Sequence, residues 1–198
     1  MNQQQLTDLA DEYNDYFSVN HTLSINVRLL GDADTLPPPE HFADAIPEPF
    51  LLSSELEQLN HSALRPLNRL GELAEELSLY LQQQARKIDL LMHYLLKQHD
   101  MPEHRYQTLS FGGSGCSYLA KTPLQPTQVV EIKLFLDNNE GAVFCYGQVV
   151  SCEKEAELWQ IKVVFRRIRD EDRELIVRAS LHQQSRQLKL RAEQRQQP

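Results

Sequence analysis

The sequence predicts an α+β protein in which a small antiparallel β-barrel with a C-terminal helix carries a long inserted heptad helix. Three observations support this fold class. Apolar residues follow a heptad period between residues 67 and 98, alternate with polar residues in short runs after residue 104, and give way to a charged helical pattern from residue 169. With 198 residues, 41% of them apolar, the chain is long enough for one domain with an extension.

Charge is distributed unevenly along the chain. The first 50 residues hold nine acidic side chains and one basic side chain (net −8), whereas residues 151–198 hold eleven basic and eight acidic side chains (net +3). The overall charge of −8 argues against general DNA or RNA binding, which depends on clustered Lys and Arg. Only the basic tail could meet phosphate, and the alternative is that both ends are solvated surfaces.

Hydropathy argues against a membrane protein. No apolar stretch approaches the roughly 18 residues that a membrane span needs. The N-terminus lacks the basic and apolar parts of a signal peptide. We therefore expect a cytoplasmic protein.

The chain begins with an acidic segment, residues 1–21, which is followed by two segments of different character. Apolar and polar residues alternate in residues 22–30, which predicts a half-buried first barrel strand with inward positions at Leu23, Ile25, Val27 and Leu29. Prolines in residues 31–52 exclude a regular helix or central strand, because proline lacks an N–H and fixes φ. We expect an extended linker there that packs Phe42, Ile46, Phe50 and Leu51 against another part of the molecule.

Residues 53–100 are predicted to be inserted helices that mediate oligomerisation. Ser53 and Ser54 are candidate N-caps, and a heptad register begins at residue 67. Its core positions are Leu67, Leu70, Ala74, Leu77, Leu81, Gln84, Ile88, Leu91, Leu95 and Gln98. A helix over residues 67–98 would be about 48 Å long at ~1.5 Å per residue, which is too long for a domain of this size to cover.

A further column of side chains widens this apolar stripe. It holds Leu73, Tyr80, Lys87 and Tyr94, and its width favours more than two helices because a dimer would leave the column in water. Gln84 is a polar core position of the kind that fixes helix register. We expect a homo-oligomer, and the alternative is an intramolecular hairpin with residues 51–64.

Residues 104–198 are predicted to form the barrel and its helix. The period changes to two, with strands expected at 106–111, 116–119, 129–136, 142–150 and 159–166. A final helix is expected over residues 169–195, with acidic side chains in its first turn and basic ones towards its end, as the helix dipole favours. Five antiparallel strands followed by a helix are typical of a small closed barrel.

No group of residues predicts an enzyme or a metal site. The seven histidines are scattered, and Ser114 is not a nucleophile elbow because residue 116 is cysteine rather than glycine. The three cysteines, Cys116, Cys145 and Cys152, favour core thiols over a disulfide framework. The glycine turn at residues 112–115 has two interpretations, a backbone that approaches a ligand closely or a tight crossover between strands.

The order of these elements resembles a PilZ domain over about residues 106–195, with residues 22–30 as a first strand. The resemblance rests on apolar positions in Cys116-Ser117-Tyr118, VVEIKLFL, GQVV, WQIKVVF and DEDRELIVR. The insertion resembles the atypical tetrameric PilZ group, through the segments FSVNHTLSINVRLL, AIPEPF, QQQARKIDLLMHYLLKQ and LSFGGSGCSY. This resemblance implies a role in cyclic di-GMP signalling and a tetramer formed through the inserted heptad helices.

PilZ proteins typically bind cyclic di-GMP with an RxxxR stretch before the first strand and a D/N-x-S-x-x-G turn, where arginine forks meet phosphate and guanine. Here residues 13–19 contain no arginine, and RxxxR occurs only at Arg65/Arg69, Arg169/Arg173 and Arg191/Arg195. In the turn, Ser110, Gly112 and Gly115 stand at the D/N, S and G positions, and a shifted alignment instead uses Thr108, Ser110 and Gly113. Losing two charge-assisted contacts of roughly 1.5–3 kcal/mol each would weaken binding by several orders of magnitude.

We therefore expect a non-enzymatic regulator of bacterial cyclic di-GMP signalling, without metal or cofactor, that acts through a homo-oligomer and contacts with an unidentified protein. Cyclic di-GMP binding at the degenerate turn, Ser110, Gly112, Gly113 and Gly115, is expected to be weak or absent. The alternative is a genuine receptor that binds the nucleotide through other arginines: Arg28, Arg105, Arg166 or Arg167.

Overall fold

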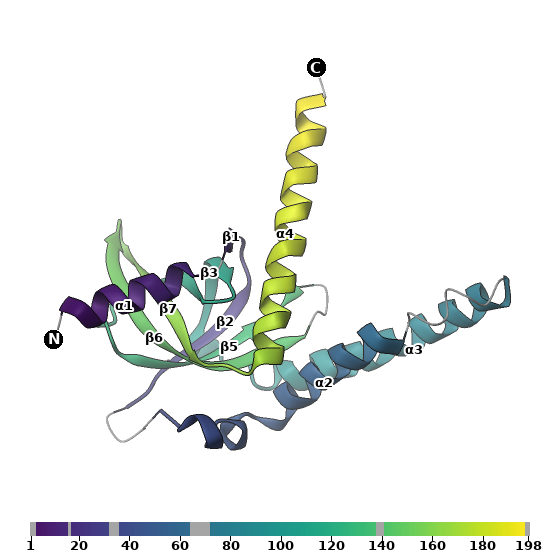
Figure 1. Ribbon diagram of the computed structural model, residues 1–198, viewed down its shortest axis with the longest axis horizontal. Coiled ribbons are helices and arrows are strands. Elements are labelled where there is room, and N and C mark those ends of the chain that lie inside the picture. Colours follow the sequence, from purple (N-terminus) through teal and green to yellow (C-terminus); the bar gives the residue numbers. More distant parts are fainter. Residues whose placement is uncertain (1–2, 16, 32–35, 64–71, 138–140, 197–198) are drawn as a thin grey trace.

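The computed structural model describes residues 3–15, 17–31, 36–63, 72–137 and 141–196. Within these residues the strands are β1 (Ser18–Asn20), β2 (Ser24–Leu29), β3 (Arg105–Gly112), β4 (Gly115–Ala120), β5 (Val129–Phe135), β6 (Ala142–Glu155) and β7 (Leu158–Arg167). They lie in the order β1-β3-β2-β5-β6-β7-β4, and β3 also pairs with β4. Six antiparallel strands therefore close into a barrel, to which β1 adds a short extension (Figure 1). The predicted fold class is confirmed.

The first barrel strand, β2, is shorter than the strand predicted over residues 22–30, and a separate short strand, β1, precedes it. β1 and β2 pair with different parts of β3, and Thr108 spans the irregular point between them. The Thr108 hydroxyl accepts a hydrogen bond from the Leu23 amide (2.8 Å) and donates one to the His21 carbonyl (2.7 Å). It thereby satisfies backbone groups that the ladder leaves unpaired. The prediction that Leu29 points inward is wrong, because this side chain is exposed where β2 ends.

Alternating residues of the strands fill the barrel, and the final helix closes it. The core includes Ile25, Ile132, Leu134, Val143 and Val163. Leu175, Ile176 and Ala179 of α4 (Asp170–Gln196) pack onto the same core. Cys116 and Cys145 are fully buried core residues, and burial raises the pKa of Cys116 to about 12.

The inserted segment packs on the outside of β6. Phe42, Ile46, Phe50 and Leu96 form a second apolar cluster with Ala142, Phe144 and Tyr146, which point away from the barrel interior. The linker contains the 3-10 turns Pro39–His41 and Ala43–Ala45, and its expected anchors Phe42, Ile46 and Phe50 are buried. Beyond the cluster, α2 (Glu48–Ala63) and α3 (Glu72–Lys97) project from the barrel as a helical arm (Figure 1).

Helix α2 begins earlier than the predicted N-caps. It starts at Glu48, with Pro49 in the first turn, where a missing N–H has no cost and a fixed φ suits the helix. Ser53 and Ser54 are therefore buried inside the helix, and the Ser53 hydroxyl accepts a hydrogen bond from the Ala142 amide (3.1 Å). Their role is to attach α2 to the barrel.

The two ends of the chain lie on different sides of the barrel. Helix α1 (Gln3–Asn14) crosses β6 and β7, where Leu9 is buried against Val150 and Val164. Helix α4 begins beside the barrel, where both Oδ atoms of the buried Asp172 accept hydrogen bonds from Arg169 (2.8 and 2.9 Å), and then extends away from it (Figure 1). The bounds of α4 agree with the helix predicted over residues 169–195.

The aromatic contacts of Phe50 generate a stability prediction. Phe50 is fully buried between Phe135, Phe144 and His99, so Phe50→Ala should lower the free energy of unfolding by about 3–5 kcal/mol through lost burial and a residual cavity. Leu52→Ala, on the exposed side of the same helix, should cost less than about 1 kcal/mol. Urea denaturation followed by circular dichroism measures both, and equal losses would contradict the prediction.

Candidate functional site

The chain's own N-terminal segment lies directly against the glycine turn between β3 and β4. A Cβ atom on Gly112 would lie 2.2 Å from the Phe17 carbonyl oxygen. A Cβ atom on Gly115 would lie 2.1 Å from the Val163 carbonyl oxygen and 3.0 Å from the Tyr13 ring. Both distances are too short for any side chain, so these positions require glycine. The groups that approach the turn closely are therefore the backbone of Phe17, the backbone of β7 and the ring of Tyr13.

Tyr13 occupies the surface beside the predicted nucleotide turn. Its phenol forms hydrogen bonds with Ser110 and Ser117, and its backbone carbonyl accepts one from the Ser114 hydroxyl (2.5 Å). Burial raises the pKa of Tyr13, and the hydrogen bonds from the two serines oppose that increase. The Ser110 and Ser117 hydroxyls are also hydrogen-bonded to each other, 2.7 Å apart. Ser110, the expected counterpart of the family's Asp or Asn, is thus engaged within the chain.

The arginines of the alternative site all have partners within the chain. Arg166 forms an ion pair with Glu12 of α1, and the Arg167 Nε donates a hydrogen bond to the Pro37 carbonyl (3.0 Å). Arg28 is paired with Glu131 (2.7 Å), and Arg105 with Asp100 (2.7 Å). The four side chains come from β2, β3 and β7 and share no single cluster of contacts. Arg173, half of an RxxxR pair, donates to the Gly113 carbonyl.

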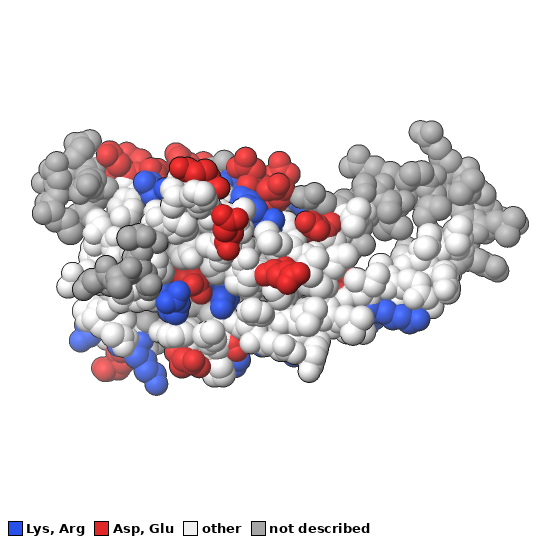
Figure 2. Space-filling view, turned by 90° about the horizontal axis from the view of Figure 1, so that it is seen from below, with Lys and Arg blue, Asp and Glu red and all other residues white. Residues whose placement is uncertain are grey.

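The heptad positions of α3 form an exposed apolar seam, which we define by its described members: Leu77, Leu81, Gln84, Ile88, Leu91 and Leu95. The five apolar members are 38–67% exposed, whereas Leu96 on the barrel side is 5% exposed. Tyr80 and Tyr94 of the neighbouring column are exposed as well. Leu67 and Leu70 lie outside the described residues, as does the side chain of Ala74. Figure 2 shows that the described part of the helical arm is mostly uncharged on the face in view.

Helix α2 does not cover this seam. It runs beside α3, as the intramolecular alternative required (Figure 1), but it leaves all five apolar seam residues exposed. Exposed leucines in one continuous stripe are unusual on a protein surface, where large apolar patches mark interaction sites.

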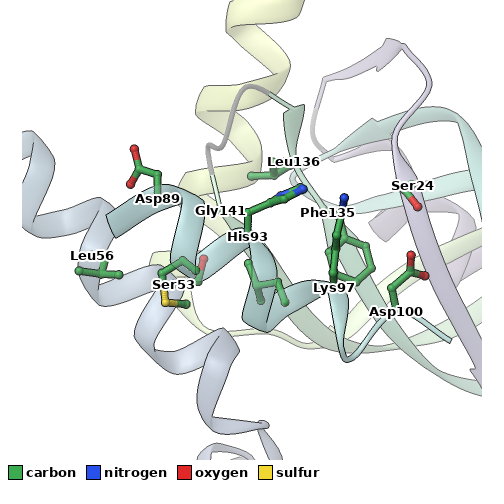
Figure 3. Close-up of a pocket in the computed structure, with 12 residues that line it drawn as sticks. Ser24, Ser53, Leu56, Asp89, His93, Lys97, Asp100, Phe135, Leu136 and Gly141 are labelled. Carbon is green, nitrogen blue, oxygen red and sulfur yellow. The ribbon is translucent and has the colours of Figure 1, made fainter. Parts of the chain in front are cut away.

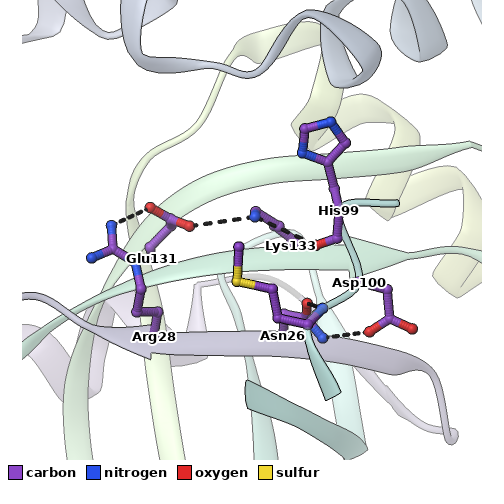
Figure 4. Close-up of polar contacts among 7 residues, drawn as sticks. Asn26, Arg28, His99, Asp100, Glu131 and Lys133 are labelled. Atoms are coloured by element: carbon purple, nitrogen blue, oxygen red, sulfur yellow. Dashed lines mark hydrogen bonds and ion pairs between the residues drawn. The ribbon is translucent and has the colours of Figure 1, made fainter. Parts of the chain in front are cut away.

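A network of polar side chains joins the end of α3 to the barrel (Figure 4). The buried Asn26 amide donates to Asp100 (2.7 Å), and its carbonyl oxygen accepts a hydrogen bond from the Met101 amide (2.5 Å). Lys133, itself 7% exposed, reaches the His99 carbonyl (3.5 Å) and lies 3.7 Å from Glu131. These contacts hold the chain that leaves α3 against β2 and β5, so they fix the direction of the arm relative to the barrel.

Neither the packing of α1 over the glycine turn nor this polar network was predicted from the sequence. The spacing of Leu9 and Tyr13, i and i+4 on one helix face, was a signal that α1 packs against something. Nothing in the sequence pairs Asn26 with Asp100, which are 74 residues apart.

A metal centre and a membrane-spanning helix are both absent from the part of the chain that the structure describes. No three His, Cys, Asp or Glu side chains lie together there as a metal site. No helix among those residues is long and apolar enough to cross a membrane.

Comparison with protein-family models identifies the family. The model of the PilZ domain matches residues 81–182, which is 102 of the 198 residues. This chain belongs to the PilZ domain family. PilZ domains form a cyclic di-GMP signalling family, and the match indicates no catalytic family. The match begins inside α3, earlier than residue 106, so the family region includes much of the seam. No curated protein matches this chain.

One solved structure of a PilZ protein shares the fold, and other solved structures are less similar. A tetrameric PilZ domain protein from Xanthomonas campestris, which self-assembles through a helical bundle, is 15% identical with a TM-score of 0.56, and the alignment covers 93% of this chain and 98% of that one. An inhibitor of motility from Bacillus subtilis is 8% identical over 87% of this chain and 52% of its own, with a TM-score of 0.47. The PilZ domain of an Escherichia coli protein with cyclic di-GMP is 12% identical over 47% of this chain and 82% of its own, with a TM-score of 0.37. At these identities the likeness to the tetrameric protein establishes the fold.

The Asn26 contacts generate a pH-dependent prediction. Burial raises the pKa of Asp100, but hydrogen bonds from Arg105 and Asn26 outweigh burial, so the pKa lies below its ordinary value. The stabilisation is therefore present above the usual Asp pKa of about 3.9 and is lost as the pH falls through the lowered value. Asn26→Ala should cost about 2 kcal/mol at neutral pH, and the cost should shrink as the pH falls below about 4 and through the lowered pKa of Asp100.

Urea denaturation at several pH values measures this cost. Asn20→Ala, at an exposed position of β1, is the matched control and should change the free energy of unfolding little. A cost for Asn26→Ala that stays constant with pH would show that the Asp100 contact contributes nothing.

Proposed function

We propose that this protein is a non-enzymatic PilZ regulator in cyclic di-GMP signalling, which acts as a homo-oligomer through contacts with a protein partner and binds cyclic di-GMP weakly or not at all at the degenerate turn. The observation that carries the proposal is the apolar seam of α3, exposed along its described length in the single chain.

Assembly through the seam follows from its composition and width. Burying exposed leucine and isoleucine side chains between helices removes apolar surface from water, at about 25 cal/mol per Å². The additional exposure of Tyr80 and Tyr94 favours a bundle of more than two helices, because two helices would leave these rings in water. We propose a tetramer. The Xanthomonas campestris protein, which self-assembles as a tetramer through a helical bundle, supports this choice.

A tetramer of this kind would present four barrels on one bundle. Linked copies of a weak contact surface bind a multivalent partner more strongly than one copy does, because later contacts form at high effective concentration. The polar network at the end of α3 holds each barrel in a defined direction, which multivalent binding requires. We place this regulator in the cytoplasm.

The surroundings of the degenerate turn support the proposal that it binds cyclic di-GMP weakly or not at all. Tyr13 lies against Ser110 and Gly115, where the family's turn would meet its ligand. Residues 13–19 supply no arginine, and the acidic Glu12 stands nearby. A dianionic ligand there would have to displace Tyr13 without gaining charge-assisted contacts.

The alternative function, a genuine cyclic di-GMP receptor with non-standard arginines, is favoured by one observation. The ion pair between Arg166 and Glu12 is 35% and 45% exposed on its two side chains. An exposed pair of this kind contributes about 0–1 kcal/mol, so a nucleotide phosphate could compete for Arg166 at small cost.

Calorimetric titration with cyclic di-GMP distinguishes the two functions. We expect no saturable binding up to about 100 μM, because the charged partners of the usual site are missing. Micromolar binding that is lost in Arg166→Ala and kept in Arg186→Ala, an exposed arginine of α4, would overturn the proposal in favour of the alternative.

Light scattering tests the assembly separately. We expect a mass of about four times the chain mass of 22.9 kDa, and a monomeric mass for the double variant Leu77→Asp with Leu81→Asp, because two carboxylates would be buried in the seam. The matched control, Leu79→Asp with Leu90→Asp, changes exposed leucines on the opposite side of α3 and should leave the mass unchanged. A monomeric wild type, or an unchanged mass for the seam variant, would contradict the proposed assembly.

A further inference from the structure

A cavity of about 180 Å³ lies where the helical arm meets the barrel (Figure 3). We call it the junction cavity. Leu56 of α2 lines one side, Asp89, Met92 and Leu96 of α3 line another, and Phe135 and Leu136 at the end of β5 lie opposite. Nothing in the proposed function uses it.

The size and walls of the junction cavity limit its ligand. Sites for drug-sized ligands usually enclose about 300–1,000 Å³, so this cavity suits a much smaller molecule and is too small for a cyclic dinucleotide. Polar and apolar residues both line it, but most of the wall surface is apolar and includes Met92, whose flexible thioether adapts to different shapes. A ligand here therefore needs a short apolar body.

Asp89 brings a carboxylate to the wall of this cavity. Among the described residues, no side chain or amide forms a hydrogen bond or ion pair with its carboxylate, and burial raises its pKa. Two of the other polar side chains in the wall form hydrogen bonds within the protein: Asp100 binds Asn26 and Arg105, and the Ser53 hydroxyl accepts a bond from the Ala142 amide. Lys97 lies near Asp100, whose pKa its charge helps to lower, at the other end of the cavity from Asp89 (Figure 3).

The junction cavity would stay open in a bundle formed by the seam. Asp89, His93 and Lys97 follow one another at four-residue intervals, so they share a face of α3. At about 100° per residue, the three side chains of that face lie about 100° or more around the helix from Ile88, Leu91 and Leu95. Helices that pack on the seam would not cover it.

We propose that the junction cavity binds a small organic cation, an amine or guanidine on a short apolar body, whose charged group pairs with Asp89. The apolar body contacts Met92, Leu96 and Phe135, and the bound molecule bridges α3 and β5. Such a ligand compensates a partly buried carboxylate that has no partner among the described residues.

Titration of the full chain with 2-phenylethylamine, followed by NMR, tests this proposal. The neutral analogue 2-phenylethanol is the matched ligand, and Asp89→Asn is the matched variant. The amine should bind saturably to the wild type. The alcohol, and the amine with Asp89→Asn, should bind about 10- to 100-fold more weakly, as expected for loss of a charge-assisted contact.

Two controls separate a lost site from a lost fold. Glu103→Gln removes an exposed carboxylate outside the cavity and should leave the affinity for the amine unchanged. Asp89→Asn should unfold at the same urea concentration as the wild type or a higher one, because the carboxylate that it removes has no partner within the described part of the chain. Equal affinity for the amine and the alcohol, undiminished binding to Asp89→Asn, or no saturable binding of the amine up to millimolar concentration would overturn the proposal.

Discussion

Strand β6 is apolar on both faces, and the rest of the structure depends on how both faces are covered. Val143 and Cys145 point into the barrel, while Phe144 and Tyr146 point away from it, and all four are buried. An outward aromatic face of this kind requires a second layer. The linker, the start of α2 and the end of α3 supply that layer, so the same contacts that complete the barrel also anchor the helical arm. The direction in which the apolar seam leaves the barrel follows from this packing together with the Asn26 and Lys133 contacts.

The acidic N-terminal segment of the chain contacts the more basic C-terminal part. Glu12 of α1 pairs with Arg166 of β7, and Tyr13 lies on the glycine turn that a typical relative would use for its ligand. An exposed ion pair contributes little, so the buried contacts of Leu9 and the hydrogen bonds of Tyr13 hold α1 in place. Because α1 brings acidic residues and Tyr13 to the glycine turn, its position is a physical reason for the proposed loss of nucleotide binding.

Elements that depend on local periodicity were predictable from the sequence. The strands after residue 104, the final helix and the heptad register each repeat a signal over many residues, and the fold class followed from them. Helix α2 begins at Glu48 because proline is tolerated in a first turn, a context that composition alone does not reveal. Leu29 is exposed because its strand ends there. The short strand β1 depends on Thr108, 85 residues along the chain from Leu23, and could not be predicted from its three residues.

The sequence by itself determined the period of each element, the apolar seam, and the missing arginines and acidic residue of the nucleotide motifs, because these properties belong to residue type and spacing. Tertiary structure alone decided which surfaces cover one another. It placed α2 beside α3 without covering the seam, laid Tyr13 on the glycine turn and paired each candidate arginine within the chain. It also put Asp89 in the wall of the junction cavity, with no partner among the residues that the structure describes. Contacts between distant segments depend on the geometry of packed surfaces, and local sequence carries little information about them.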